Sequence, residues 1–326
     1  MNAEDAIERG DSAARAWASR MLRHLFPHWG LWIAVLCLLA LNLGWVMLSP
    51  RIRVGEGFAL TCLGALAASG VILFYREIRH HAADEIFDRL IKTLIALMFA
   101  LLMMKNLQVF NHLAMTLPFP LADHWLIAWD HALGFDWNAY AMKIAQRPWL
   151  KDVLLFAYNS LTNVMIGVIL VALIALGMPS RVNELAYLVL ASGIICISVS
   201  AMLPAEAAWN TLAQPEVKAI LGGTPGGDWL DQFKALRSGG AIDLGSRPLT
   251  GLATFPSFHT CLGLIILWCS RGHWATFIPG AAAGLAVIAA TPVFGGHYVT
   301  DLLGGAAVML ALIMLWHWRP AGQGGA

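Results

Sequence analysis

Two short segments in the last quarter of the chain bring histidine together with other polar residues. Residues 255–260 read FPSFHT and contain His259, while residues 295–301 read GGHYVTD and contain His297 and Asp301. An aspartate four residues from a histidine can hold one imidazole nitrogen and leave the other as a nucleophile. The second histidine can protonate a leaving oxygen and later accept a proton from an incoming hydroxyl. These groups suffice for a two-step phosphoryl transfer that needs no metal ion and no other cofactor.

Most of the chain is apolar, so the elements that position these residues are expected to be membrane helices. Of the 326 residues, 59% are hydrophobic and 13% are charged. The apolar residues gather in runs of about 20, the length that crosses a bilayer core as a helix. The sequence therefore predicts an all-α, polytopic membrane helix bundle with about eight spans. We place them at approximately 30–49, 56–75, 88–108, 152–177, 183–203, 257–271, 274–294 and 298–317.

The order of the last three spans predicts that the two polar segments share one membrane face. The sixth and eighth spans run in the same direction, because the seventh span returns between them. Both histidines then lie near helix N-termini, where exposed N–H groups and the helix dipole favour a phosphate. At a spacing of four, His297 and Asp301 are expected on one helix face. Gly295 and Gly296 are expected to allow close approach of the backbone to a ligand.

Lysine and arginine in the short loops predict a cytoplasmic N-terminus. The N-terminal 28 residues, the loop between the second and third spans, and the later inner loops all carry arginine. Arg51 and Arg53 fall on the opposite side, against this orientation. Residues 3–26 are expected to form an amphipathic helix at the membrane surface rather than a cleavable signal peptide. Two long connections, 109–151 and 204–256, then face outward.

The remaining composition restricts the partners of the chain. The net charge is +1, so no electrostatic argument favours a nucleic-acid partner. All five cysteines lie in apolar runs, without disulfide or zinc spacing, and are interpreted as packing residues. The expected partners are the membrane itself and a lipid substrate within it.

Plainer interpretations exist for the same residues. A lone histidine in an interfacial turn is often a surface or packing residue, and Asp301 could simply cap the last helix. The chain could also be a non-enzymatic lipid-binding or transport protein on an enzyme-like fold. Against transport, ionisable residues cluster at span ends, and no inverted repeat is evident.

At these segments the chain resembles the type 2 phosphatidic acid phosphatase superfamily. That superfamily has a Pro-Ser-x-His motif followed by a His-x-x-x-Asp motif on a six-helix core, matched here by residues 256–259 and 297–301. The similarity covers roughly residues 88–317. It looks closest to the branch that contains fungal inositol phosphorylceramide synthase and related bacterial proteins. The first two spans are an addition to the six-helix core.

The resemblance implies a role for each matching residue. His297 would be the nucleophile that forms a phosphohistidine, and Asp301 would orient and polarise it. His259 would be the acid that frees the leaving group and the base that activates the acceptor. Ser257 would hydrogen-bond phosphate oxygens, and Tyr298 and Gly296 are further candidates for contact with substrate.

The sequence departs from the superfamily pattern in its cations. Thr291 stands where the superfamily has an arginine six residues before the nucleophile. A cation must still neutralise phosphate charge during transfer. Arg237 is the first candidate, because related bacterial sequences carry an arginine there, and Arg247 is the second.

These observations predict a membrane lipid phosphotransferase or phosphatase, with either a lipid or polyol hydroxyl or water as the acceptor. The chain is divided into an N-terminal segment (1–28), two additional helices (29–87), the six-helix core (88–317) and a tail (318–326). The expected location is a bacterial inner membrane, with the site facing the periplasm.

Overall fold

The computed structural model describes residues 25–49, 51–78, 85–222, 229–245 and 249–318. The amphipathic helix expected over residues 3–26 lies almost wholly outside this part of the chain. The described part is built from helices, with a single pair of two-residue strands in it. The prediction of an all-α membrane bundle is confirmed.

The long helices follow the predicted spans closely. In chain order they are α2 (Trp29–Leu48), α3 (Glu56–Ile78), α4 (Glu85–Ala114), α7 (Pro148–Phe156) continued by the π-helix η1 (Ala157–Leu161) and α8 (Thr162–Ala175), α9 (Pro179–Met202), α13 (Phe258–Cys269), α14 (Trp274–Phe294) and α15 (Val299–His317).

The number of clear spans is smaller than predicted. Within the described residues, six helical segments are long and apolar enough to cross a membrane. The other two predicted spans are α4 and α13. Helix α13 has only 12 residues, about 18 Å at 1.5 Å per residue. Helix α4 has 30 residues and carries charged side chains in its first turns. Both lie inside the bundle against helices that qualify.

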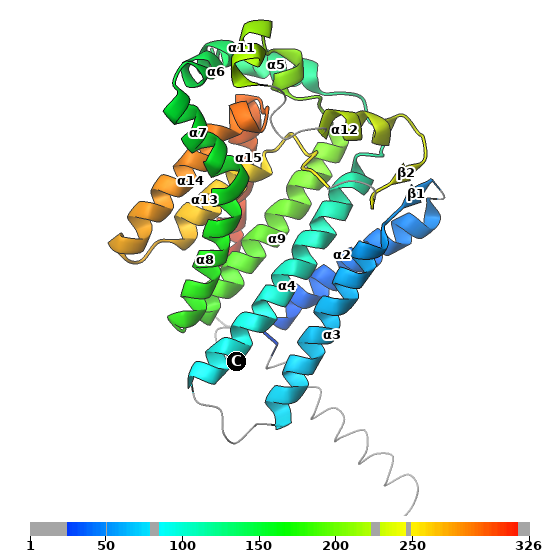
Figure 1. Cartoon of the computed structure of the whole chain (residues 1–326), viewed down its shortest axis with the longest axis vertical. Coiled ribbons are helices and arrows are strands. Elements are labelled where there is room, and N and C mark those ends of the chain that lie inside the picture. Colours follow the sequence, from blue (N-terminus) through cyan, green and yellow to red (C-terminus); the bar gives the residue numbers. More distant parts are fainter. Residues whose placement is uncertain (1–24, 50, 79–84, 223–228, 246–248, 319–326) are drawn as a thin grey trace, which may run out of the picture.

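The long helices run side by side, and one end of the bundle is covered by short helices (Figure 1). This outer cap consists of α5 (Asp123–Ala132), α6 (Trp137–Ala145), α10 (Ala208–Thr211), α11 (Pro215–Leu221) and α12 (Trp229–Arg237). Helices α13 and α15 both begin beneath the cap. The backbone N–H of Ser257 donates to the carbonyl of Asp301 at 2.9 Å. The predicted meeting of the two polar segments at one end is therefore confirmed.

Small residues bring α13 and α14 into direct backbone contact. A Cβ atom added at Gly263 would lie 2.8 Å from the carbonyl oxygen of Gly284, and one at Gly284 would overlap the Gly263 carbonyl. Membrane helices pack closely where such residues face each other. This contact fixes α13, and with it His259, against the helix that leads into the second polar segment.

The two strands connect the first helices to the outer connection. Strand β1 (Ile52–Arg53) pairs in parallel with β2 (Ile242–Asp243). Gly55 and Gly245 follow the strands at such close range that a Cβ at Gly55 would lie 2.6 Å from the Cα of Gly245. The additional helices α2 and α3 are thus joined to the segment that leads into residues 249–254.

Candidate active site

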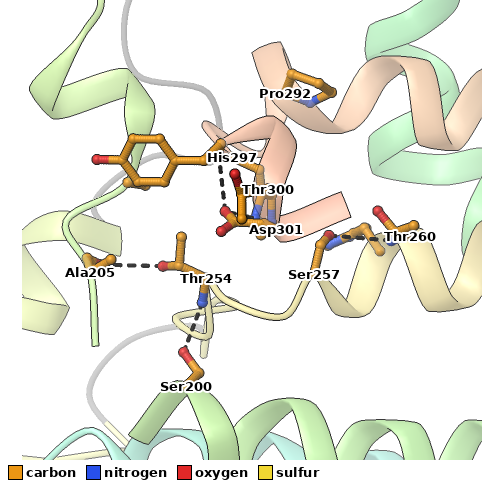
Figure 2. Close-up of polar contacts among 12 residues, drawn as sticks. Ser200, Ala205, Thr254, Ser257, Thr260, Pro292, His297, Thr300 and Asp301 are labelled. Atoms are coloured by element: carbon orange, nitrogen blue, oxygen red, sulfur yellow. Dashed lines mark hydrogen bonds and ion pairs between the residues drawn. The ribbon is translucent and has the colours of Figure 1, made fainter. Parts of the chain in front are cut away.

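His297 and Asp301 form a buried pair at the start of α15. The Nδ1 atom of His297 lies 2.9 Å from Oδ2 of Asp301, and the backbone N–H of Tyr298 donates to the same oxygen at 3.0 Å (Figure 2). The contact between His297 and Asp301 agrees with their spacing of four residues, but the two residues do not lie on one helix face as expected. The helix begins at Val299, so His297 precedes it, and Asp301 reaches back from the first turn rather than along one helix face.

The surroundings of His297 keep its imidazole neutral. Burial lowers the pKa of His297 to about 4, and a hydrogen bond to the backbone of Thr254 offsets part of that shift. Because Nδ1 contacts the carboxylate, Nε2 is the nitrogen that would attack phosphorus, and it would exchange its contact with the Thr254 backbone for the substrate. A neutral imidazole with a carboxylate on one nitrogen is the form that attacks phosphorus.

The backbone around His297 is held from the outer cap. The indole N–H of Trp137 donates to the carbonyls of Pro292 and His297 at 3.2 and 3.1 Å. Gly296 has φ of +68°, and a Cβ there would lie 3.0 Å from the Cβ of Trp209. Glycine is needed here for the turn itself. Gly296 therefore shapes the loop, and the residue that lines the pocket is its neighbour Gly295.

The N-terminus of α15 is already occupied by a carboxylate. Asp130 of α5 accepts from the backbone N–H groups of Val299 and Thr300 at 2.9 and 2.8 Å, and from the Thr300 hydroxyl at 2.6 Å. These are the donors that would favour a phosphate at a helix start. The expectation that this helix end binds phosphate is therefore corrected, because Asp130 takes that place.

Ser257 and Tyr298 also have structural partners. The hydroxyl oxygen of Ser257 accepts from the backbone N–H of Thr260 at 3.3 Å and caps α13 (Figure 2). The Tyr298 hydroxyl donates to Oδ1 of Asp123 at 2.8 Å and lies 2.6 Å from the hydroxyl of Thr211. Both side chains are fully buried. Neither residue is among the described lining residues of the pocket described next, and the substrate contacts expected of Ser257 and Tyr298 stay predictions.

His259 and His297 line one pocket of about 370 Å³ beneath the cap. His259 is the second residue of α13, and its Nδ1 lies 3.1 Å from the hydroxyl of Tyr158. The other lining residues come from η1, the outer connection, α12 and the end of α14: Tyr158, Asn159, Ala207, Trp229, residues 249–254, Phe294 and Gly295. The pocket thus brings two imidazoles to one small volume, which is the arrangement that a two-step transfer requires.

The pocket has no lysine or arginine among its described lining residues. Arg237 donates to the carbonyls of Leu117 (3.0 Å) and Phe119. It lies eight residues along α12 from Trp229, which is about 12 Å. The structure therefore does not bring Arg237 to the pocket, and its guanidinium instead secures the connection after α4. Arg247, the second candidate, lies outside the described residues.

Tyr158 lines the pocket but does not stand out as a site residue in the sequence. The sequence places it in the fourth span, where polar residues are usually explained by hydrogen bonds between helices. Its partner His259 is 101 residues away. The only local signal is a tyrosine next to Asn159 within an apolar run, and that signal does not identify the partner.

The chain thus combines helices long and apolar enough to cross a membrane with a histidine and a His–Asp pair at one end of the bundle. A family model described as the PAP2 superfamily matches residues 124–315, which is more than half of the chain. The chain belongs to this superfamily, whose members are generally phosphatases or phosphotransferases. No curated protein matches the chain, and no solved structure does either.

Proposed function

We propose that the protein is a metal-independent lipid phosphotransferase or phosphatase that works through a phosphohistidine at His297. The observation that carries the proposal is the His297–Asp301 pair at 2.9 Å, opening on the same pocket as His259. Family membership supports the phosphoryl chemistry. The exposed apolar surface of the long helices supports a substrate that reaches the site from the bilayer.

The first step forms the covalent intermediate. The Nε2 lone pair of His297 attacks phosphorus, and the bond from phosphorus to the leaving oxygen breaks. The imidazolium of His259 gives its proton to that oxygen, so the leaving group departs as an alcohol. The ring of His297 becomes cationic as the phosphorus–nitrogen bond forms, and Asp301 stabilises that charge.

The second step returns the enzyme to its starting state. An acceptor hydroxyl gives its proton to the now neutral His259 while its oxygen attacks phosphorus. The phosphorus–nitrogen bond breaks, and neutral His297 is restored. A lipid or polyol hydroxyl as acceptor makes the protein a transferase, and water makes it a phosphatase. We propose the transferase direction, on the likeness of residues 255–259 and 295–301 to the branch of inositol phosphorylceramide synthase.

The sidedness of the site is part of the proposal. Arg76 lies in the last turn of α3, Arg89 and Arg181 lie near the starts of α4 and α9, and Arg271 lies in the turn after α13. These helix ends are the ones that lie away from the cap (Figure 1). With arginine on the cytoplasmic side, the pocket faces outward, toward the periplasm if the membrane is a bacterial inner membrane. Gly251 is exposed and lines the pocket. A Gly251→Cys variant should react with a membrane-impermeant thiol reagent in intact cells, and reaction only after lysis would place the site inside.

The enzymatic proposal is tested with purified protein and a panel of lipid donors and acceptors, analysed by mass spectrometry with a metal chelator present. Wild type should release phosphate or exchange headgroups and form an acid-labile phosphoprotein. His297→Ala should lose both activities. His131→Ala is the matched control, because His131 is exposed in α5 and does not line this pocket. Full activity of His297→Ala would disprove the nucleophile, and an inactive wild type would favour a non-enzymatic protein.

A further inference from the structure

A five-residue π-helix lies directly beside the two histidines. η1 (Ala157–Leu161) interrupts the fourth span between α7 and α8. The Thr162 hydroxyl donates to the carbonyl of Ala157 at 3.0 Å, across the widened turn. Single π-turns within α-helices are uncommon and occur frequently at functional sites. This one presents Tyr158 to the pocket.

Tyr158 contacts His259 in two ways. The two rings stack with their centroids 4.1 Å apart and their planes 24° from parallel. The Tyr158 hydroxyl lies 3.1 Å from Nδ1 of His259. One side chain therefore fixes both the plane of the imidazole and the partner of its Nδ1 atom, which leaves Nε2 as the nitrogen for proton transfer.

Gly295 allows this tyrosine to come close to the second histidine. A Cβ atom at Gly295 would lie 2.8 Å from the hydroxyl oxygen of Tyr158 and 2.6 Å from Cδ2 of His297. Only a residue without a side chain lets both groups occupy these positions. The Tyr158 hydroxyl thus lies where the environments of the two histidines meet.

We propose that Tyr158 is the positioning residue of the acid–base histidine, the neutral counterpart of Asp301 at the nucleophile. This inference rests on the proposed function. In both steps of the proposed mechanism, His259 keeps its proton on Nδ1 and donates a hydrogen bond through it to the Tyr158 oxygen. The proton on Nε2 goes to the leaving oxygen in the first step and is regained from the acceptor in the second.

The difference between the two partners suits the two tasks. A carboxylate stabilises a positive ring and would hold the proton on its histidine, which helps the nucleophile but hinders a proton donor. A phenol is uncharged and either donates or accepts a hydrogen bond. It can therefore orient His259 without binding the transferred proton more tightly.

The test is Tyr158→Phe, which keeps the ring and removes the hydroxyl. With a donor that has an alkyl leaving group, kcat should fall about 10- to 100-fold, the range seen when the outer partner of a metal-bound histidine is removed, with KM changed less than about threefold. With a p-nitrophenyl leaving group, which departs without a proton, phosphoenzyme formation should remain close to wild type. Dephosphorylation still needs the base, so phosphoenzyme should accumulate in the variant.

Tyr140→Phe is the matched control. The Tyr140 hydroxyl donates to the carbonyl of Ala289 at 2.7 Å, outside the pocket. Its loss should affect the melting temperature without any dependence on the leaving group. Equal losses with both donors for Tyr158→Phe, or an unchanged kcat with the alkyl donor, would overturn the role of Tyr158. In either case, a working wild type and an inactive His297→Ala would leave the proposed function standing.

Discussion

Asp301→Asn is the substitution that most directly tests the charge at the nucleophile. The side chain is fully buried, and its Oδ2 accepts from the Tyr298 backbone at 3.0 Å and contacts His297 Nδ1 at 2.9 Å. Asparagine has nearly the same shape and still offers one acceptor oxygen. The variant therefore removes the charge and preserves most of the packing.

The expected loss follows from the charge that forms on His297 during transfer. When phosphorus bonds to Nε2, the ring becomes cationic; its Nδ1 lies 2.9 Å from the carboxylate oxygen, so the charge spread over the ring is taken at about 4 Å. At an effective dielectric constant of about 20, two unit charges at that distance attract by about 4 kcal/mol. Loss of this attraction in the transition state corresponds to a decrease of about 10³ in kcat. Substrate binding precedes the charge, so KM should change little.

The assay is single-turnover formation of phosphoenzyme by purified wild type and Asp301→Asn. The control is Asp130→Asn, an identical change at the same helix start. Asp130 bonds Val299 and Thr300 but not His297. Asp130→Asn should lower the free energy of unfolding by about 1 kcal/mol and leave kcat within about threefold of wild type. A rate for Asp301→Asn above one tenth of wild type would refute the argument from charge, as would equal rate losses in both variants.

Two further predictions concern the charge of the site. Because His297 must be neutral to attack, phosphoenzyme formation should decline on acidification only as pH falls through about 4, the lowered pKa of this residue. The pH profile is measured with a phosphodiester donor, because a diester lacks the ionisation that a monoester has near pH 6. A midpoint near the ordinary histidine pKa of about 6.5 would contradict the prediction. If Arg247 supplies the cation, Arg247→Gln should lower kcat by about 10²- to 10³-fold, while Arg237→Gln, which removes bonds to Leu117 and Phe119, should mainly lower the melting temperature. The reverse pattern would indicate that Arg237, and not Arg247, neutralises the phosphate.

The fold was predictable to a large extent because its main determinant is local. Runs of about 20 apolar residues specify membrane helices without reference to the rest of the chain. The seventh predicted span, 274–294, has the same bounds as α14. The predicted spans 88–108 and 257–271 also correspond to helices, α4 and α13, although neither is among the six helices long and apolar enough to cross a membrane, and α13 has only 12 residues.

The short helices of the outer cap were not predicted. Residues 109–151 and 204–256 were interpreted as long connections, yet they contain α5, α6, α10, α11 and α12. These helices have few residues each, and their stability comes from packing onto the bundle rather than from a local pattern.

For the site, the sequence by itself determined which residues could react. The motifs with His259, His297 and Asp301 are local, and the direction of the spans brings them to one end. Tertiary structure decided what else reaches the pocket, because the direction of a side chain depends on the segments packed against it. Ser257 caps α13, Tyr298 bonds Asp123, and Arg237 bonds loop carbonyls.

Tyr158, by contrast, reaches His259 from a span 101 residues earlier. Only the packing of the π-helix against α14 and the space above Gly295 place it there. The spacing of residues in a motif indicates which neighbouring groups act in the same site. Contacts between distant helices depend on the packing of the whole bundle, and they determine how each histidine is held.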